Sequence, residues 1–162
     1  MSKKEITIGI DVGGTNSVFG AVDREGNIIA ADTISTRDYV RAGEFVNAIS
    51  GRIKILLKSF ENKYVLKGIG IGAPNANYYT GNIEFAPNLK WKEKIPLRDM
   101  IKAHFDAPVM ITNDANAAAI GEMIYGGAKD MKDFVVVTLG TGVGSGFVVN
   151  GKLFYGHDGF AG

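Results

Sequence analysis

The chain has 162 residues, of which 46% are hydrophobic and 22% are charged. This length and composition are typical of a soluble globular protein with one well-buried core and part of a second. A net charge of +1, with Lys and Arg interspersed among Asp and Glu, argues against the broad basic surface that nucleic-acid-binding proteins use. Cysteine is absent, which excludes disulfides and thiolate zinc sites within these residues.

The start of the sequence predicts neither secretion nor membrane insertion. Met1 to Glu5 leads directly into a strand-sized run, whereas a signal peptide requires a longer apolar segment. No other stretch approaches the length of a membrane span. We therefore expect a cytoplasmic protein without a membrane partner.

The first part of the chain predicts an antiparallel meander, a helix and a further strand. Strand-forming residues occupy 6–11, 17–23 and 28–35, with a glycine-rich loop and a polar turn between them. Between Ala42 and Phe60 apolar residues recur at helical spacing, which predicts an amphipathic helix over one face of the sheet. Residues 65–71 form the next strand, and a helical crossover most simply makes it parallel to the first.

A loop, two helices and another strand follow. Residues 72–94 are rich in Asn, Gly, Tyr and Pro without sustained periodicity, and their aromatic residues favour a long, ordered loop. A short helix from Pro96 to Ala103, a strand at 109–112 and an alanine-rich helix at 114–125 complete one α/β domain.

The end of the chain repeats the opening meander. Strands are expected at 134–139, 146–150 and 152–155. We therefore divide the chain into a domain of residues 1–130 and the first strands of a second, incomplete domain at 131–162. That second domain is expected to have no covering helices of its own, so its sheet would expose apolar surface. We therefore expect either self-association through this sheet or a second domain that is mobile relative to the first.

Two glycine-rich loops, each after a run of strand-forming residues, are the most informative feature of the chain. One reads Ile-Asp-Val-Gly-Gly-Thr-Asn over 10–16, and the other reads Thr-Leu-Gly-Thr-Gly-Val-Gly over 138–144. Glycine tolerates left-handed or crowded backbone, so that N–H groups can close on an anion. A lone loop of this kind is more often a tight hairpin turn. Two of them, each followed by a strand, a turn and a strand, favour a phosphate clamp.

The clamp defines the predicted nucleotide site. Asp11 follows an apolar strand, where it could hold Mg²⁺ directly or through water, although a turn-forming aspartate is the alternative. The predicted nucleotide-binding residues are Asp11, Gly13, Gly14, Thr15 and Asn16 from the first loop and Gly140, Thr141 and Gly142 from the second.

Asp114 is the predicted catalytic residue. It lies where a buried strand meets a helix, beside Asn113, and open α/β sheets place ligands at that edge. A carboxylate there could accept the proton of a hydroxyl that attacks a phosphate. Local sequence alone favours a different role for Asp114, as the N-cap of the helix.

Five motifs resemble, in the same order, those of the sugar kinases of the ROK family (repressors, open reading frames and kinases), especially its bacterial glucokinases. They are Asp-Val-Gly-Gly-Thr at 11–15, Gly-Ala-Pro at 72–74, Pro-Asn-Leu-Lys-Trp at 87–91, Asn-Asp-Ala-Asn at 113–116 and Leu-Gly-Thr-Gly-Val-Gly at 139–144. The resemblance runs from Ile6 to Gly162. It implies the actin-like ATPase fold, in which two ribonuclease-H-like domains close on a nucleotide.

The resemblance also implies a sugar site. It assigns sugar binding to Asn113 and Asp114 and makes Asp114 the general base, which reverses the preference for a helix cap. The rest of this predicted site is Gly72, Ala73, Pro74, Asn75 and Asn88, residues that individually are more often turn formers. Many family members have glycine where this chain has Asn75, which leaves sugar specificity open.

Neither of the two histidines is expected to bind a metal. His104 is interpreted as a surface residue at a helix end. His157 lies just before the place where the family carries its Glu-x-Gly-His sugar motif, so it is assigned to the sugar site, with a solvated loop histidine as an equal alternative.

The implied activity is ATP-dependent phosphorylation of a hexose, with glucose as the leading acceptor and Mg²⁺–ATP held between the glycine loops. The alternatives are a non-catalytic sugar- or nucleotide-sensing module, another ATPase of the superfamily, or a kinase for fructose, mannose or an N-acetylhexosamine. The first strand begins almost at Met1, so the helix-turn-helix of the family's repressors is not expected. We expect a homo-oligomer, a dimer, whose isolated residues 1–162 fold but do not phosphorylate sugar.

Overall fold

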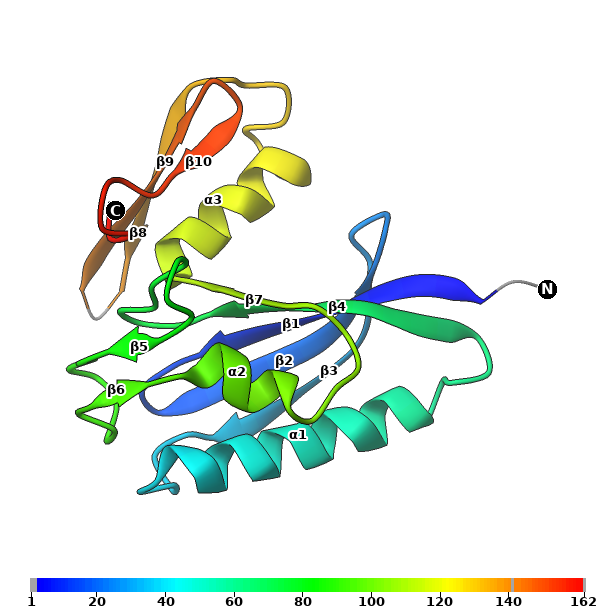
Figure 1. The fold of residues 1–162 in the computed structure, drawn as a ribbon. Helices are drawn as coiled ribbons and strands as arrows, with labels where there is room; N and C mark the ends of the chain where they lie inside the picture. Colours follow the sequence, from blue (N-terminus) through cyan, green and yellow to red (C-terminus); the bar gives the residue numbers. More distant parts are fainter. Residues whose placement is uncertain (1–2, 141, 162) are drawn as a thin grey trace.

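A five-stranded mixed sheet forms the larger part of the computed structural model, which describes residues 3–140 and 142–161 (Figure 1). The strand order is β3-β2-β1-β4-β7. The antiparallel meander consists of β1 (Lys4–Val12), β2 (Asn16–Asp23) and β3 (Ile28–Ser35). Strands β4 (Tyr64–Gly72) and β7 (Val109–Thr112) run parallel to β1, as the crossover pattern predicts.

Two helices, α1 (Ala42–Lys58) and α2 (Leu97–Lys102), cover one face of this sheet (Figure 1). Alternate residues of β1 are apolar and buried, which is the pattern of a strand with one face in a core. Ile8, Phe45 and Ile49 are among the completely or almost completely buried residues of this core. The amphipathic spacing in the sequence therefore places the helix correctly.

A third helix, α3 (Asp114–Ile124), lies between the five-stranded sheet and a second sheet of three antiparallel strands (Figure 1). The second sheet has the order β10-β9-β8, with β8 at Phe134–Leu139, β9 at Val143–Val149 and β10 at Lys152–Phe154. One helix thus packs against both sheets, and the division into domains near residue 130 stays a prediction.

The structure differs from the sequence-based expectations in three places. The expected long loop contains a small antiparallel pair, β5 (Ile83–Glu84) and β6 (Lys94–Ile95). Strand β9 begins at Val143, whereas the sequence predicts a start at residue 146. The prediction missed the first residues because glycine weakens the sequence signal of a strand. In the structure the same glycines allow β9 to pack closely under α3. The second sheet is not bare, since the small alanines of α3 allow that helix to cover one of its faces.

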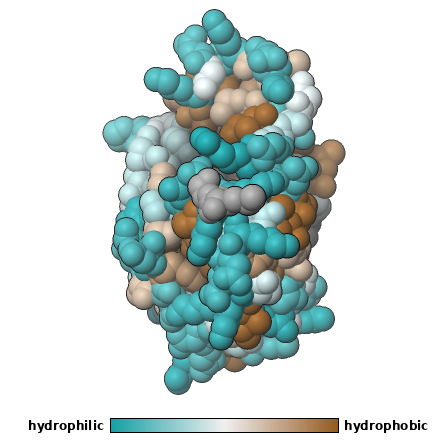
Figure 2. Space-filling view, turned by 90° about the vertical axis from the view of Figure 1, so that its right-hand side faces the viewer, coloured by the Kyte–Doolittle hydropathy of each residue, from teal (hydrophilic) through white to brown (hydrophobic). Residues whose placement is uncertain are grey.

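The side of the molecule shown in Figure 2 is mainly hydrophilic, and its apolar residues form separate patches. In the described part of the chain, α1 is the longest helix at 17 residues, and none of the helices has the length and apolar character needed to cross a bilayer.

Candidate active site

A cleft of about 570 Å³ lies where the carboxyl ends of β1, β4 and β7 meet the turn between β8 and β9. Ligands of open α/β sheets bind at this edge. Residues from both predicted sites therefore face one space. The lining consists of Asp11, Val12, Gly13, Gly14, Pro74, Asn75, Asn88, Asn113, Asp114, Ala115, Thr138, Leu139, Gly140, Gly142, Val143, Gly144, Ser145 and Phe160.

The first glycine loop is a tight turn whose glycines are required by close packing. The N–H of Gly13 donates to the carbonyl of Asn16 at 3.1 Å and closes the turn between β1 and β2. A Cβ atom at Gly13 would lie 2.5 Å from that carbonyl oxygen, and one at Gly14 would lie 2.5 Å from the carbonyl oxygen of Asn88. The contact of Gly14 with Asn88 brings the turn at 87–91 to the cleft.

Gly140 and Gly142 of the second glycine loop have open space around them. The N–H of Gly140 donates to the carbonyl of Gly142 at 2.9 Å. A Cβ atom at either glycine would have no neighbouring atom within 4 Å. The backbone is therefore accessible to a ligand on this wall of the cleft. Thr141, predicted to bind nucleotide, lies outside the described residues.

Asn113 is the N-cap of α3, and this leaves Asp114 available to the cleft. The Oδ1 atom of Asn113 accepts a hydrogen bond from the N–H of Asn116 at 2.6 Å. Asp114 is the first residue of the helix, and one of its carboxylate oxygens accepts from the N–H of Ala115 at 2.9 Å. The helix-capping role that local sequence suggests for Asp114 thus belongs to its neighbour.

Asp11 and Asp114 give the cleft an unbalanced negative charge. Partial burial raises the pKa of the Asp11 carboxyl above its ordinary value, and the nearby charge of Asp114 raises it further. A cation in the cleft would relieve this repulsion. The described residues contain no cluster of three or more His, Cys, Asp or Glu side chains suited to a metal ion. A metal ion held here would therefore need water or phosphate oxygens as further ligands.

Some predicted site residues lie outside the lining of the cleft. Gly72 lines a separate apolar groove on the open face of the sheet, and Ala73 is completely buried. Thr15 lies in the turn between β1 and β2, and Asn16 is the first residue of β2. The His157 side chain is 98% exposed, and its assignment to the sugar site stays a prediction.

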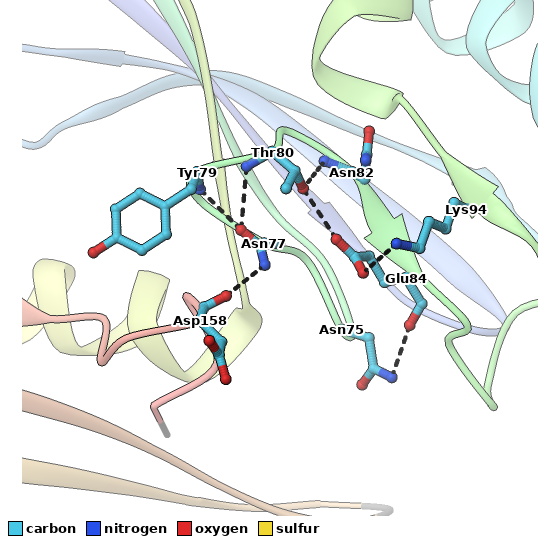
Figure 3. Close-up of polar contacts among 8 residues, drawn as sticks. All are labelled: Asn75, Asn77, Tyr79, Thr80, Asn82, Glu84, Lys94 and Asp158. Carbon is cyan, nitrogen blue, oxygen red and sulfur yellow. Dashed lines mark hydrogen bonds and ion pairs between the residues drawn. The ribbon is translucent and has the colours of Figure 1, made fainter.

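Asn75 has a backbone conformation that both glycine and asparagine adopt readily. Its φ of 51° lies in the left-handed region, which glycine and asparagine tolerate best. The side-chain Nδ2 donates to the carbonyl of Glu84 at 3.1 Å (Figure 3). The Glu84 N–H donates to the Asn75 carbonyl at 3.0 Å. The Asn75 side chain therefore ties its loop to β5.

Eight lining residues are not among the predicted site residues, namely Val12, Ala115, Thr138, Leu139, Val143, Gly144, Ser145 and Phe160. Thr138 and Ser145 flank the second glycine loop, so their position beside that motif could have identified them as site residues. Phe160 has no comparable local signal, because a distant loop holds the segment that carries it.

Comparisons with known proteins identify the family of this chain. Residues 7–162 match the model of the ROK family. A glucokinase from Streptomyces coelicolor is 38% identical over 157 residues, which are 96% of this chain and 47% of that protein. A xylose repressor from Caldicellulosiruptor bescii is 43% identical over 96 residues, which are 59% of this chain and 24% of that protein.

A solved structure has the same fold. It is a ROK family glucokinase from Streptomyces griseus in complex with glucose and AMPPNP, with a TM-score of 0.80 and 35% identity over 96% of this chain and 48% of that chain. The chain thus spans about half the length of these glucokinases. From the family match, the relatives and the shared architecture, we conclude that the chain belongs to the ROK family and has its actin-like ATPase fold.

Proposed function

We propose that the full-length protein transfers the γ-phosphate of ATP to a hydroxyl of a hexose, with glucose as the leading acceptor. The observation that carries this proposal is the position of Asp114, which faces a cleft between two glycine loops while Asn113 caps the helix. The similarity to glucokinases, one of them in complex with glucose and AMPPNP, supports the same substrates.

In this proposal Asp114 is the general base. Its carboxylate accepts the proton of the sugar hydroxyl while the hydroxyl oxygen attacks the γ-phosphorus and the bond to the ADP oxygen breaks. The amide groups of Asn75, Asn88 and Asn113 bind the other sugar hydroxyls. This role agrees with Asn113 using its Oδ1 atom as the helix cap, since its Nδ2 remains a donor for the sugar.

The two glycine loops would bind the phosphates through backbone N–H groups, an arrangement that suits an anion. Asp11 fits Mg²⁺ because its carboxylate lies in the same cleft. A bound cation would also relieve the repulsion between Asp11 and Asp114, which opposes the ionisation of Asp11. The ion would supply positive charge that offsets the negative charge of the transferred phosphoryl group.

A non-catalytic sensor is the second candidate, since the xylose repressor shares 43% identity over part of this chain. A sensor would need a sugar pocket but no base. The carboxylate of Asp114 in the cleft favours the kinase. We propose that the enzyme acts in the cytoplasm as a homodimer, the state expected from the sequence.

The test is an ADP-release assay on the full-length protein with a panel of glucose, fructose, mannose and N-acetylhexosamines. We expect Mg²⁺-dependent ADP release that requires sugar and is most efficient with glucose. Asp11→Ala should weaken nucleotide use and leave sugar binding intact. Sugar binding without ADP release from any of these sugars would favour the sensor, and another preferred sugar would replace glucose.

A further inference from the structure

We infer that Asn77 is a positioning residue that ties one wall of the cleft to the other. It belongs to the loop that carries Pro74 and Asn75, and it holds the segment that carries Phe160. The two segments are far apart in the sequence, because Asn77 and Asp158 are 81 residues apart. The tie itself is independent of the proposed function, whereas its effect on sugar binding rests on that function.

Asn77 uses both ends of its side-chain amide in this tie (Figure 3). Its Oδ1 atom accepts from the N–H groups of Tyr79 at 2.9 Å and Thr80 at 3.2 Å, which fixes its own loop. Its Nδ2 atom donates to the carbonyl of Asp158 at 2.8 Å, which reaches the other segment. Asn77 is only 3% exposed, so water cannot readily replace these bonds.

Further bonds connect the tie to a residue of the cleft (Figure 3). The hydroxyl of Thr80 donates to a carboxylate oxygen of Glu84 at 3.1 Å. The backbone of Glu84 is paired with Asn75, and the other carboxylate oxygen of Glu84 lies 3.2 Å from the ammonium group of Lys94. Asn77 thus stands between Asp158 and the hydrogen-bonded loop that presents Asn75.

The surrounding packing leaves little room for a different arrangement. The rings of Tyr78 and Tyr155 stack with centroids 4.1 Å apart and planes at 14°. Gly159 has a φ of 83°, and a Cβ atom there would lie 2.7 Å from Oδ1 of Asn77. A side chain at Gly159 would therefore push the segment away from Asn77.

Asparagine suits this position because it both accepts and donates hydrogen bonds. Asn77→Asp keeps an acceptor for the N–H groups of Tyr79 and Thr80. It replaces the donor with an oxygen that faces the Asp158 carbonyl. The substitution therefore breaks the tie while preserving the bonds within the loop. Asn82→Asp is a matched control, because it adds the same charge to the loop and no side-chain bond joins Asn82 to Asp158 among the described residues.

The first measurement is amide hydrogen exchange in the 162-residue chain. The N–H of Ala161 donates to the carbonyl of Tyr155 at 3.1 Å and reports on the tied segment. In Asn77→Asp this amide should exchange about tenfold faster than in Asn82→Asp or the wild type, since the lost hydrogen bond is buried. The amides of Tyr79 and Thr80 should stay protected. Equal exchange of Ala161 in all three proteins would overturn the tie.

The second measurement is steady-state kinetics of the full-length protein. Because Asn77 touches neither reacting group, Asn77→Asp should raise the KM for sugar about tenfold and leave kcat within about threefold. Asn82→Asp should leave both unchanged. If the wild-type protein acts on no sugar, the proposed function is wrong. The Asn77–Asp158 tie is then tested by hydrogen exchange alone. An active wild type with an unchanged KM in Asn77→Asp overturns the positioning role.

Gly159→Ala provides a second variant if Asn77→Asp does not fold. Its methyl group displaces the segment from the opposite side and keeps Asn77 intact. It should reproduce the faster exchange of Ala161 and the higher KM. Wild-type values in a folded Gly159→Ala protein would overturn the inference.

Discussion

At the scale of single residues, Asp11 is ionised at a cost to stability. Burial and then the charge of Asp114 raise the pKa of Asp11 above its ordinary value of 3.8. The folded chain therefore binds a proton at Asp11 more tightly than the unfolded chain does. Stability from this group is greatest below the ordinary pKa and is lost as pH rises through the raised folded-state pKa. A charge that destabilises the fold is a common feature of functional sites.

Asp11→Asn should stabilise the 162-residue chain at pH 7, because it removes this charge. The free energy of unfolding should rise by about 0.2–1 kcal/mol, a range discounted for a half-exposed, solvent-screened group. Below about pH 3 the advantage should disappear, since aspartate is then protonated in both states. Denaturant unfolding at the two pH values measures this. A variant less stable than the wild type at pH 7 would contradict it.

The sequence predicts the position of Asp114 at the start of a helix. It does not predict the hydrogen bond by which Asn113 caps that helix and leaves the Asp114 carboxylate facing the cleft. A strand–helix junction with adjacent Asn and Asp is visible in the chain, and either residue can cap the helix. Only the three-dimensional structure assigns the cap to Asn113. Phe160 and Asn77 depend on a pairing over 81 residues, for which local patterns contain no information.

At the scale of elements, α3 and the glycines of β9 hold the second sheet in place. A Cβ atom at Gly146 would lie 2.7 Å from Cβ of Ala119 and 2.8 Å from the carbonyl oxygen of Ala115. Regular elements were predictable because their periodicities are local. The close fit of β9 under α3 was not, since glycine in a strand usually signals weak strand structure.

Gly146→Ala should therefore loosen the second sheet. We expect the free energy of unfolding to fall by about 1–3 kcal/mol, the usual cost of overpacking. Gly51→Ala is the matched control, because Gly51 lies on the exposed face of α1 with no atom near its missing Cβ. It should stabilise the chain by about 0.5–1 kcal/mol through helix propensity. Denaturant unfolding distinguishes the two, and stabilisation by both would refute the close packing.

At the scale of the whole molecule, the second sheet has one covered and one open face. Val148 faces α3 and is 1% exposed, whereas Val137 and Leu139 on the other face are 58% and 81% exposed. The pairing register places further apolar residues on the open face. They are Val135, Val143, Phe147, Val149 and Phe154. We expect an apolar face of this kind to bind another protein surface.

The 162-residue chain should therefore self-associate through the open face of the second sheet. Val137→Lys should shift it toward monomer, since a charge on this face opposes apolar contact. Val40→Lys is the matched control, because Val40 is 68% exposed and lies before α1. Light scattering over a range of concentrations measures the effect. A wild-type chain that stays monomeric throughout would contradict the prediction.

The same 162 residues should lack kinase activity, because precise positioning supplies most of the rate in phosphoryl transfer. They span about half the length of the related glucokinases. Sugar-dependent ADP release that co-elutes with the purified 162-residue chain would contradict this prediction. It would show that these residues are sufficient for catalysis.

The measurement that tests the kinase proposal most directly is the turnover of Asp114→Asn in the full-length protein. The amide keeps hydrogen bonding to the sugar but cannot accept its proton. We predict that kcat falls by about two to four orders of magnitude, the usual contribution of a general base, while sugar affinity stays within about tenfold. Unchanged turnover in a variant that binds sugar normally would contradict the assignment of Asp114 as the base.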